Sequence, residues 1–274
     1  MILVVRMMSK YWQQREAQQR LKFQSKTENE INRELRKLYR AAADKVVSDM
    51  ELIYPSLLED DALANYYYRY KRYYQLRERI NKELSTLGKS ELKLLDKKFE
   101  TMYKYSSWKT LEGLNFSVDN KMELEKVIQT LWDNRGAWKE SVWCKDGLTG
   151  AQRVEKTMTK LQNKIEKGIS DCVLRGASKD ELVRELKSTF GVSFSDADRI
   201  ARTELTYIQN QATRDSYIKA GITQYEFLAE SDDRTSDECE DLNGQVFDIA
   251  AAVVGVNYPP IHPNCRSTVL AVID

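Results

Sequence analysis

The spacing of apolar side chains changes once along this sequence, at Gly221, and that change limits the folds open to the chain. Before Gly221, apolar residues recur at intervals of three and four, which places them on one helix face, as in Ile31, Leu35, Leu38, Ala42 and Val46. After it come short alternating runs typical of strands, at 222–227, 244–249 and 265–273. We therefore predict an α+β fold: an extended, mainly helical N-terminal region, then a small C-terminal α+β domain with a short antiparallel sheet.

Proline, glycine and capping residues divide the helical region into expected helices. Pro55 should end the first helix, which begins near residue 9, because proline removes a backbone donor. A second helix is expected over 59–87, and Ser90 should cap a third that runs to Leu111. A fourth follows Asn120 and carries Met122, Leu124, Val127, Ile128 and Leu131.

The second half of the helical region is expected to contain three more helices. The first, 152–175, ends at Gly176. Ser178 and Glu181 have the form of a capping box and open a short helix through Leu186, which Phe190 and Gly191 should break. Ser195 should then cap a longer helix that Gly221 closes. Trp138 and Trp143 precede these helices in a break at 133–150, where we expect them to fill the bundle.

The charge of the chain is divided unevenly. Residues 191–274 hold 6 Lys and Arg against 14 Asp and Glu, a net charge of −8, and the remaining 37 and 28 give residues 1–190 a net charge of +9. This split predicts two modules with different partners, or two solvated surfaces. We place the domains at 1–175, a basic helical region, and 176–274.

Composition excludes several classes of protein. With 42% hydrophobic and 31% charged residues, the chain should be globular and rich in surface charge. Four cysteines in 274 residues do not make a disulfide framework. The apolar opening Met1–Arg6 is too short to span a membrane or to act as a signal sequence, and translation could also begin at Met8. A reducing compartment and no membrane association are therefore expected.

One expected helix combines aromatic and basic side chains. Arg69, Lys71, Arg72 and Arg77 are interleaved with Tyr66, Tyr67, Tyr68, Tyr70, Tyr73 and Tyr74. Tyrosine buries a large ring and keeps its hydroxyl hydrated, so ordinary packing explains the pattern. The alternative is a contact surface for nucleic acid or protein; on nucleic acid the rings would stack and these four cations would meet phosphates.

The sequence also contains one chemically distinctive group of residues near its end. The only histidine, His262, lies between Ile261 and Pro263, which fixes it on a stiff loop, and Cys265 follows three residues later. We expect Cys239 to join them through a hairpin between the 244–249 and 265–273 runs.

Three interpretations of this group stay open. It could bind zinc, with Asp232 or Asp237 as a fourth ligand. It could be a reduced, hydrogen-bonded structural cluster without metal, in which Asp232, Arg234 and Arg266 tie loops together. It could also be a Cys/His catalytic pair, which requires a lowered thiol pKa.

An ordered string of residues over the last third of the chain resembles the Mu F-like head morphogenesis family of tailed bacteriophages. It begins with Ala201, Arg202, Thr203, Glu204 and Asn210 and passes through Gly221, Tyr225, Phe227, Asp232, Asp233, Arg234, Cys239, Leu242, Gly244 and Phe247, ending with Pro260, His262, Pro263, Cys265 and Arg266. Phe227 stands where a tryptophan is expected in many members. Arg202 and Glu204 lie two apart on a helix, so each should anchor a different loop of the sheet, with catalysis by Glu204 as the alternative.

The resemblance implies a minor head (capsid) protein and no enzyme. Such a protein is a low-copy virion component that associates with the phage portal protein, and with scaffold or capsid proteins, in the host cytoplasm during assembly, and then lies inside the phage head. It is linked to DNA packaging or ejection and could bind double-stranded DNA. The alternative function is a thiol protease-like hydrolase that uses Cys239 and His262.

Overall fold

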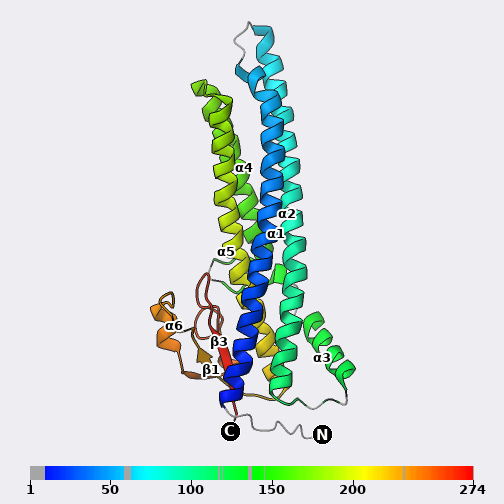
Figure 1. Cartoon of the computed structure of the whole chain (residues 1–274), viewed down its shortest axis with the longest axis vertical. Helices are drawn as coiled ribbons and strands as arrows, with labels where there is room; N and C mark the ends of the chain where they lie inside the picture. The colour runs from blue at the N-terminus through cyan, green and yellow to red at the C-terminus, as the bar shows by residue number, and fades with distance from the viewer. Residues whose placement is uncertain are drawn as a thin grey trace. The chain divides into compact units, whose positions relative to one another are not determined.

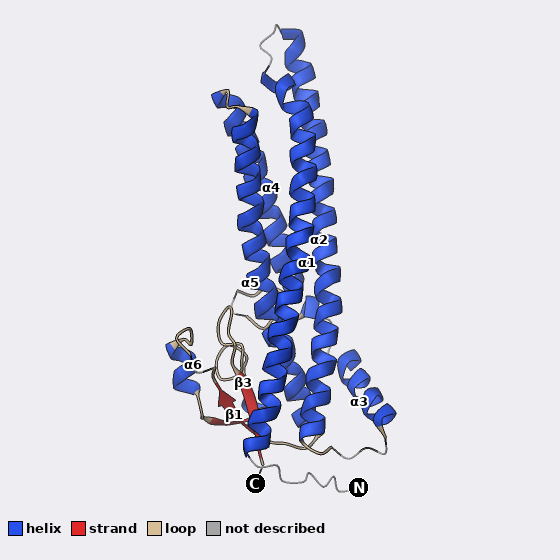
Figure 2. Cartoon of the chain, in the orientation of Figure 1, coloured by secondary structure: helices blue, strands red, loops and turns tan. Residues whose placement is uncertain are grey.

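The computed structural model describes residues 10–58, 63–116, 118, 120–134, 138–144, 146–230 and 232–273, and for 63–69 it describes the backbone alone. Long helices make up most of it, and a small sheet lies near the C-terminus, which confirms the predicted α+β class (Figures 1 and 2). The elements, in chain order, are α1 (Lys10–Leu58), α2 (Leu63–Gly113), α3 (Lys121–Asn134), η1 (Trp138–Glu140), α4 (Gly150–Arg175), α5 (Lys179–Lys219), β1 (Gln224–Leu228), α6 (Asp237–Leu242), β2 (Val246–Asp248), η2 (Ile249–Ala251) and β3 (Thr268–Val272).

Three predicted helix boundaries are wrong, because the helices continue through them. Pro55 lies inside α1, whose last turn is held by buried Tyr54 and Leu57, and the Tyr54 hydroxyl donates to the Ala177 carbonyl at 2.9 Å. Ser90 does not cap a new helix, since its hydroxyl bonds back to the Thr86 carbonyl within α2 at 2.8 Å. Tertiary burial therefore overrides the local stop signals.

The third wrong boundary lies within α5. Gly191 and Ser195 are interior residues of this helix, and the Ser195 hydroxyl bonds to the Gly191 carbonyl at 3.2 Å. The buried stripe runs on through Leu186, Phe190 and Ala197, so one apolar face spans the predicted break. The outer ends of α5 are confirmed: the Ser178 hydroxyl accepts from the Glu181 backbone at 3.2 Å, and Gly221 has a φ of 78°.

The chain divides into two compact units, of which the second comprises Asn32–Leu94 and Gln152–Asp198. It consists of segments of α1, α2, α4 and α5 that pack through aliphatic stripes. Among the buried side chains are Leu35, Val46, Met50, Leu76, Ile80, Leu84, Leu161, Ile165, Ile169, Leu182 and Leu186. Charged pairs join the helices at the surface of this unit: Arg79 meets Asp49 at 3.1 Å, and Arg77 meets Glu166 at 2.8 Å.

The first unit comprises Met1–Ile31, Leu95–Ala151 and Arg199–Asp274, and it contains the sheet. The strand order is β2-β1-β3, with both pairings antiparallel. The predicted pairing of the 244–249 run with the 265–273 run is therefore wrong, because β1 lies between them. In the central strand β1 the inward side chains Tyr225 and Phe227 are fully buried, whereas the edge strand β2 is largely exposed.

The core of the first unit lies between the helices and the sheet. Leu111 and Leu114 of α2, Ile128 of α3 and Tyr217 of α5 pack with Val269 of β3 in this core. Among the described helices, none combines the length and the apolar character needed to cross a membrane. The predicted domain boundary after residue 175 falls at the turn between α4 and α5, inside the second unit, and it stays a prediction.

Candidate functional site

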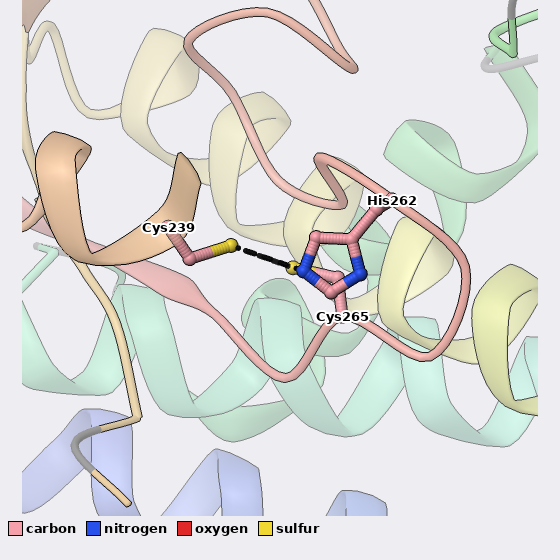
Figure 3. Close-up of side chains that lie close together, drawn as sticks. All are labelled: Cys239, His262 and Cys265. Atoms are coloured by element: carbon pink, nitrogen blue, oxygen red, sulfur yellow. Dashed lines mark hydrogen bonds between the residues drawn. The ribbon is translucent and has the colours of Figure 1, made fainter. Parts of the chain in front are cut away.

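Cys239, His262 and Cys265 lie together in the first unit (Figure 3). Cys239 projects from the short helix α6, and the other two come from the loop that leads into β3. The Cys239 sulfur is 3.3 Å from His262 Nε2 and 3.8 Å from the Cys265 sulfur, and the three candidate ligand atoms lie within 4.8 Å of one another. Both cysteines are buried, and the histidine is half-buried.

Local structure places Cys239 in this group. Ser236 caps α6, because its side chain accepts from the Cys239 backbone N–H at 3.3 Å. Cys239 then packs against Phe227, Ala229 and Cys265 in a small apolar cluster. Gly244 turns the chain from α6 into β2 with a φ of 78°, a conformation that glycine adopts without strain.

The geometry around His262 fixes which ring nitrogen carries the proton. Nδ1 lies 2.9 Å from the Pro263 carbonyl oxygen, which can only accept a hydrogen bond, so Nδ1 donates. In the neutral ring, Nε2 then carries a lone pair. That lone pair faces the Cys239 sulfur and the Ser236 hydroxyl, which is 2.9 Å away.

The two thiols have different acidities. The hydrogen bond from Cys239 lowers the pKa of Cys265 to about 6, against the opposing effect of burial. The same bond, together with burial, raises the pKa of Cys239 above the usual range of a thiol. A nucleophilic cysteine needs a lowered pKa and access to substrate, so this geometry does not favour Cys239 as the nucleophile of a hydrolase.

Asp232 is engaged elsewhere. Arg266 holds it through two hydrogen bonds, of 2.6 and 2.5 Å, which keep the pKa of the carboxyl well below its usual range. The Arg234 backbone N–H adds a third bond to the same carboxylate at 3.0 Å. Asp237 is exposed, and among the described residues neither aspartate belongs to the group of candidate ligands. The structure therefore does not bring either proposed fourth ligand to the cysteines.

Polar side chains of α5 position the loop that carries His262 and Cys265. The Thr203 hydroxyl accepts from the Asn264 backbone at 3.1 Å, and the Thr206 hydroxyl donates to the Cys265 carbonyl at 2.9 Å. Asn210 donates to the Ser267 carbonyl at 3.1 Å and accepts from the Thr268 hydroxyl at 3.0 Å. Sequence reasoning missed Thr206, although these three polar residues recur at helical spacing on a buried face, which is a readable signal.

Glu204 and Arg202 lie on the same helix in different surroundings. Glu204 is buried and accepts from the Trp143 ring N–H at 3.1 Å, and Trp143 stacks on Tyr207 with 5.1 Å between ring centroids. Arg202 is exposed. The anchoring of separate sheet loops by these two residues stays a prediction. Trp138 is buried, as expected of a residue that fills the bundle.

The basic residues proposed for DNA binding lie on α2, in the second unit. Lys71 and Arg72 are exposed. Arg77 pairs with Glu166 at 2.8 Å, so much of its charge is compensated. The Arg69 side chain lies outside the described residues. Nearby, the Tyr70 and Tyr74 hydroxyls are hydrogen-bonded at 2.8 Å on the exposed surface, and their rings pack at 4.4 Å between centroids.

Residues 163–270 match the model of the family described as Phage Mu protein F like protein, which confirms the predicted resemblance over that segment. The match includes α5, β1, β2, the first residues of β3 and all three residues of the cysteine and histidine group. It indicates a phage head-morphogenesis protein, and proteins of this family are typically structural.

Comparison with a relative and with solved structures gives little further information on function. A protein of Haemophilus influenzae, described as an uncharacterized protein, is 22% identical over 123 residues, which are 45% of this chain and 28% of that protein. The chain thus aligns with less than a third of that relative's length. No solved structure matches the chain significantly.

Proposed function

We propose that this chain is a minor head protein of a tailed bacteriophage that joins the head at the portal and acts in DNA packaging or ejection. The observation that carries the proposal is the family match over residues 163–270. In this proposal the chain meets portal, scaffold or capsid proteins in the host cytoplasm and ends inside the head. It acts by binding and does not catalyse a reaction.

Copurification tests the portal association. Procapsids assembled with and without the portal protein would be isolated, and the amount of this chain in each would be measured by quantitative mass spectrometry. We expect the chain in portal-containing particles at low copy number and its loss from portal-free ones. Equal amounts in the two preparations would contradict the portal association.

A pair of variants tests whether the matched segment mediates incorporation. Asn210→Ala removes the side chain that joins α5 to the start of β3, so it should disturb the segment and reduce the amount of chain in procapsids. Lys219→Ala is the control, because Lys219 is an exposed residue of the same helix and lies outside the family motif. Incorporation of both variants at the wild-type level would mean that portal binding depends on another part of the chain.

Weak DNA binding without sequence preference is the second part of the proposal. It rests on the net charge of +9 over residues 1–190 and on exposed Lys71 and Arg72. Phosphate contacts release counterions, so affinity should fall steeply with salt. In filter binding, Lys71→Ala/Arg72→Ala should reduce the slope of log affinity against log salt by about 2, at about 0.9 for each lost contact.

A matched control sharpens the DNA measurement. Arg77→Ala removes a cation that Glu166 already compensates, so its effect on the salt slope should be smaller than that of the double variant. If the double variant keeps the wild-type slope, this part of α2 does not bind DNA and its tyrosines serve packing alone.

A further inference from the structure

We propose that Cys239, His262 and Cys265 form a zinc site with three protein ligands, which clamps helix α6 to the loop before β3. This proposal is independent of the head-assembly function, because it rests on the geometry of the three side chains. Thiolate sulfur and imidazole nitrogen are the donors that zinc prefers in proteins.

Two of the three separations between the candidate ligand atoms agree with the dimensions of a zinc tetrahedron. Two sulfurs, each about 2.3 Å from a common zinc ion, lie about 3.8 Å apart at the tetrahedral angle, and a sulfur and a nitrogen lie about 3.5 Å apart. The observed separations are 3.8 Å between the two sulfurs and 3.3 Å between the Cys239 sulfur and His262 Nε2. The third separation, between His262 Nε2 and the Cys265 sulfur, is within 4.8 Å, so we expect these two side chains to move closer together when all three atoms surround one ion.

The histidine is already oriented as a ligand. Its Nδ1 bonds to the Pro263 carbonyl at 2.9 Å, which leaves the Nε2 lone pair directed at the cysteines. Histidines that bind metal usually donate their other N–H to a carbonyl or carboxylate in this way, which fixes the ring and the tautomer. Pro263 and the Cys265 backbone N–H, which bonds to the His262 carbonyl at 3.1 Å, hold the loop in this geometry.

The charges of the ligands and the ion also balance. One Zn²⁺ and two thiolates together carry no net charge, so their binding buries no uncompensated charge in this partly enclosed place.

A small hollow lies beside the three side chains. Ser236, Asn264, Ser267 and Arg234 line this hollow together with Cys239 and His262. Asp232 is held by Arg266, and Glu230, which also lines the hollow, is not grouped with the three candidate ligands, so we assign a water molecule to the fourth position. The half-buried histidine gives the ion a route from solvent.

Metal titration of the full chain tests the site. After removal of bound metal with a chelator under reducing conditions, Co²⁺ would be added as a spectroscopic probe, followed by Zn²⁺. We expect one Co²⁺ per chain with a sulfur-to-metal charge-transfer band, intense visible bands of tetrahedral cobalt, and full displacement by Zn²⁺. Metal should also protect Cys239 and Cys265 from alkylation, as peptide mass spectrometry would show.

Variants test whether these three residues, and not other cysteines of the chain, bind the cobalt ion. Cys265→Ser and His262→Gln should lower the cobalt affinity at least tenfold and reduce the charge-transfer band, while Cys144→Ser, which lies outside the group, should leave both unchanged. Circular dichroism of each variant would check that its helices are intact. If a variant fails to fold, the test is the alkylation of Cys239 and Cys265 in the wild-type chain, which metal should slow if these thiols are ligands.

Three results would overturn the proposal. The first is the absence of cobalt binding by the folded, reduced chain. The second is binding that survives in Cys265→Ser and His262→Gln. The third is a disulfide between Cys239 and Cys265 in the chain purified without reductant, together with no metal uptake after reduction. In each case the group would be a hydrogen-bonded structural cluster or a redox pair.

Discussion

The two units of the chain are packed by different kinds of interior. In the second unit the buried side chains are mainly aliphatic, and the buried polar ones among its described residues are Glu91, Thr157 and Ser193. In the first unit many polar side chains are buried beside the apolar core: Arg20, Gln24, Thr27, Ser106, Ser107, Thr110, Thr203, Glu204, Thr206, Gln209, Asn210, Thr213, Ser216, Ser267 and Thr268. The unit that carries the candidate site is therefore the one with a polar interior.

The two kinds of interior fix the arrangement of the packed elements to different degrees. Aliphatic stripes bring helices together but tolerate changes in exact register. Buried hydrogen bonds have directions, so they fix one arrangement of α5 against the loop that carries His262 and Cys265. Such an interior is sensitive to substitution, because a buried polar group that loses its hydrogen-bond partner strongly destabilises the fold.

Loss of the Arg20 guanidinium should have the largest effect. Arg20 is fully buried, contacts Thr110 of α2 and Thr213 of α5, and donates to the Val269 carbonyl of β3 at 3.1 Å. It also pairs with Glu16 at 3.0 Å. Arg20→Met leaves that carboxylate buried without its cation, so we expect a loss of about 4 kcal/mol in the free energy of unfolding, measured by urea denaturation.

Two further variants test the cause of this loss. Glu16→Gln/Arg20→Met removes both charges and should recover part of the stability, because an uncompensated charge no longer remains. Arg72→Met, at an exposed cation, should stay within about 0.5 kcal/mol of wild type. A loss at Arg20 no greater than that at Arg72 would mean that the polar interior of the first unit contributes little to stability.

The second unit has its own buried carboxyl, and this one should make stability depend on pH. Burial raises the pKa of Glu91 from 4.5 to about 7, although the hydrogen bond from the Tyr39 hydroxyl, at 2.9 Å, lowers it. The folded state therefore favours the protonated form. The stability that this group contributes is present in full below its unfolded pKa and is lost as pH rises through 7. Between pH 5 and pH 8 the loss should be about 2 kcal/mol.

Glu91→Gln should remove this dependence, because the amide keeps the shape of the side chain and does not ionise. Urea midpoints of the variant and of wild type, measured from pH 5 to pH 8, should diverge, with the variant more stable at the upper end. Glu83→Gln, whose side chain pairs with Lys45 at the surface, is the control and should follow wild type. Parallel curves for Glu91→Gln and wild type would show that the Glu91 carboxyl titrates normally in the folded chain.

The sequence predicts the fold class well, because three-four spacing and alternating runs reflect burial directly. Its errors fall at local stop signals. Pro55, Ser90 and Gly191 each resemble a helix boundary, yet each lies inside a helix whose buried face continues past it. Each of these residues disfavours continuation of the helix by only a few kcal/mol of free energy, so packing against distant parts of the chain can override it.

The residues of the candidate site can be predicted from the sequence, but their arrangement in the fold cannot. Cys239, His262 and Cys265 stand out by their chemistry, whereas β1 between the other two strands does not follow from local pattern. The exclusion of Asp232 as a ligand depends on Arg266, which lies 34 residues away in the chain. Partners at such separations come from the tertiary fold, so spacing along the sequence does not reveal them.

The smallest predicted effect concerns Gly191, one of the wrongly predicted helix breaks. It is an exposed interior residue of α5, and an added Cβ would meet no atom within 4 Å. Glycine costs a helix more backbone entropy than alanine does, so Gly191→Ala should stabilise the chain by about 1 kcal/mol. The urea midpoint should rise without a change in the slope of the transition.

Gly150, at the start of α4 in the first unit, should show the opposite effect on stability to Gly191. A Cβ there would lie 2.3 Å from the ring of buried Trp138, so Gly150→Ala should destabilise the chain although the substitution is the same. Trp138 packs against Phe99 and donates to Asp96, so it cannot move away without losing contacts. If Gly191→Ala also destabilises, the helix needs flexibility at that point, and the break that the sequence predicts there reflects a property of the folded chain.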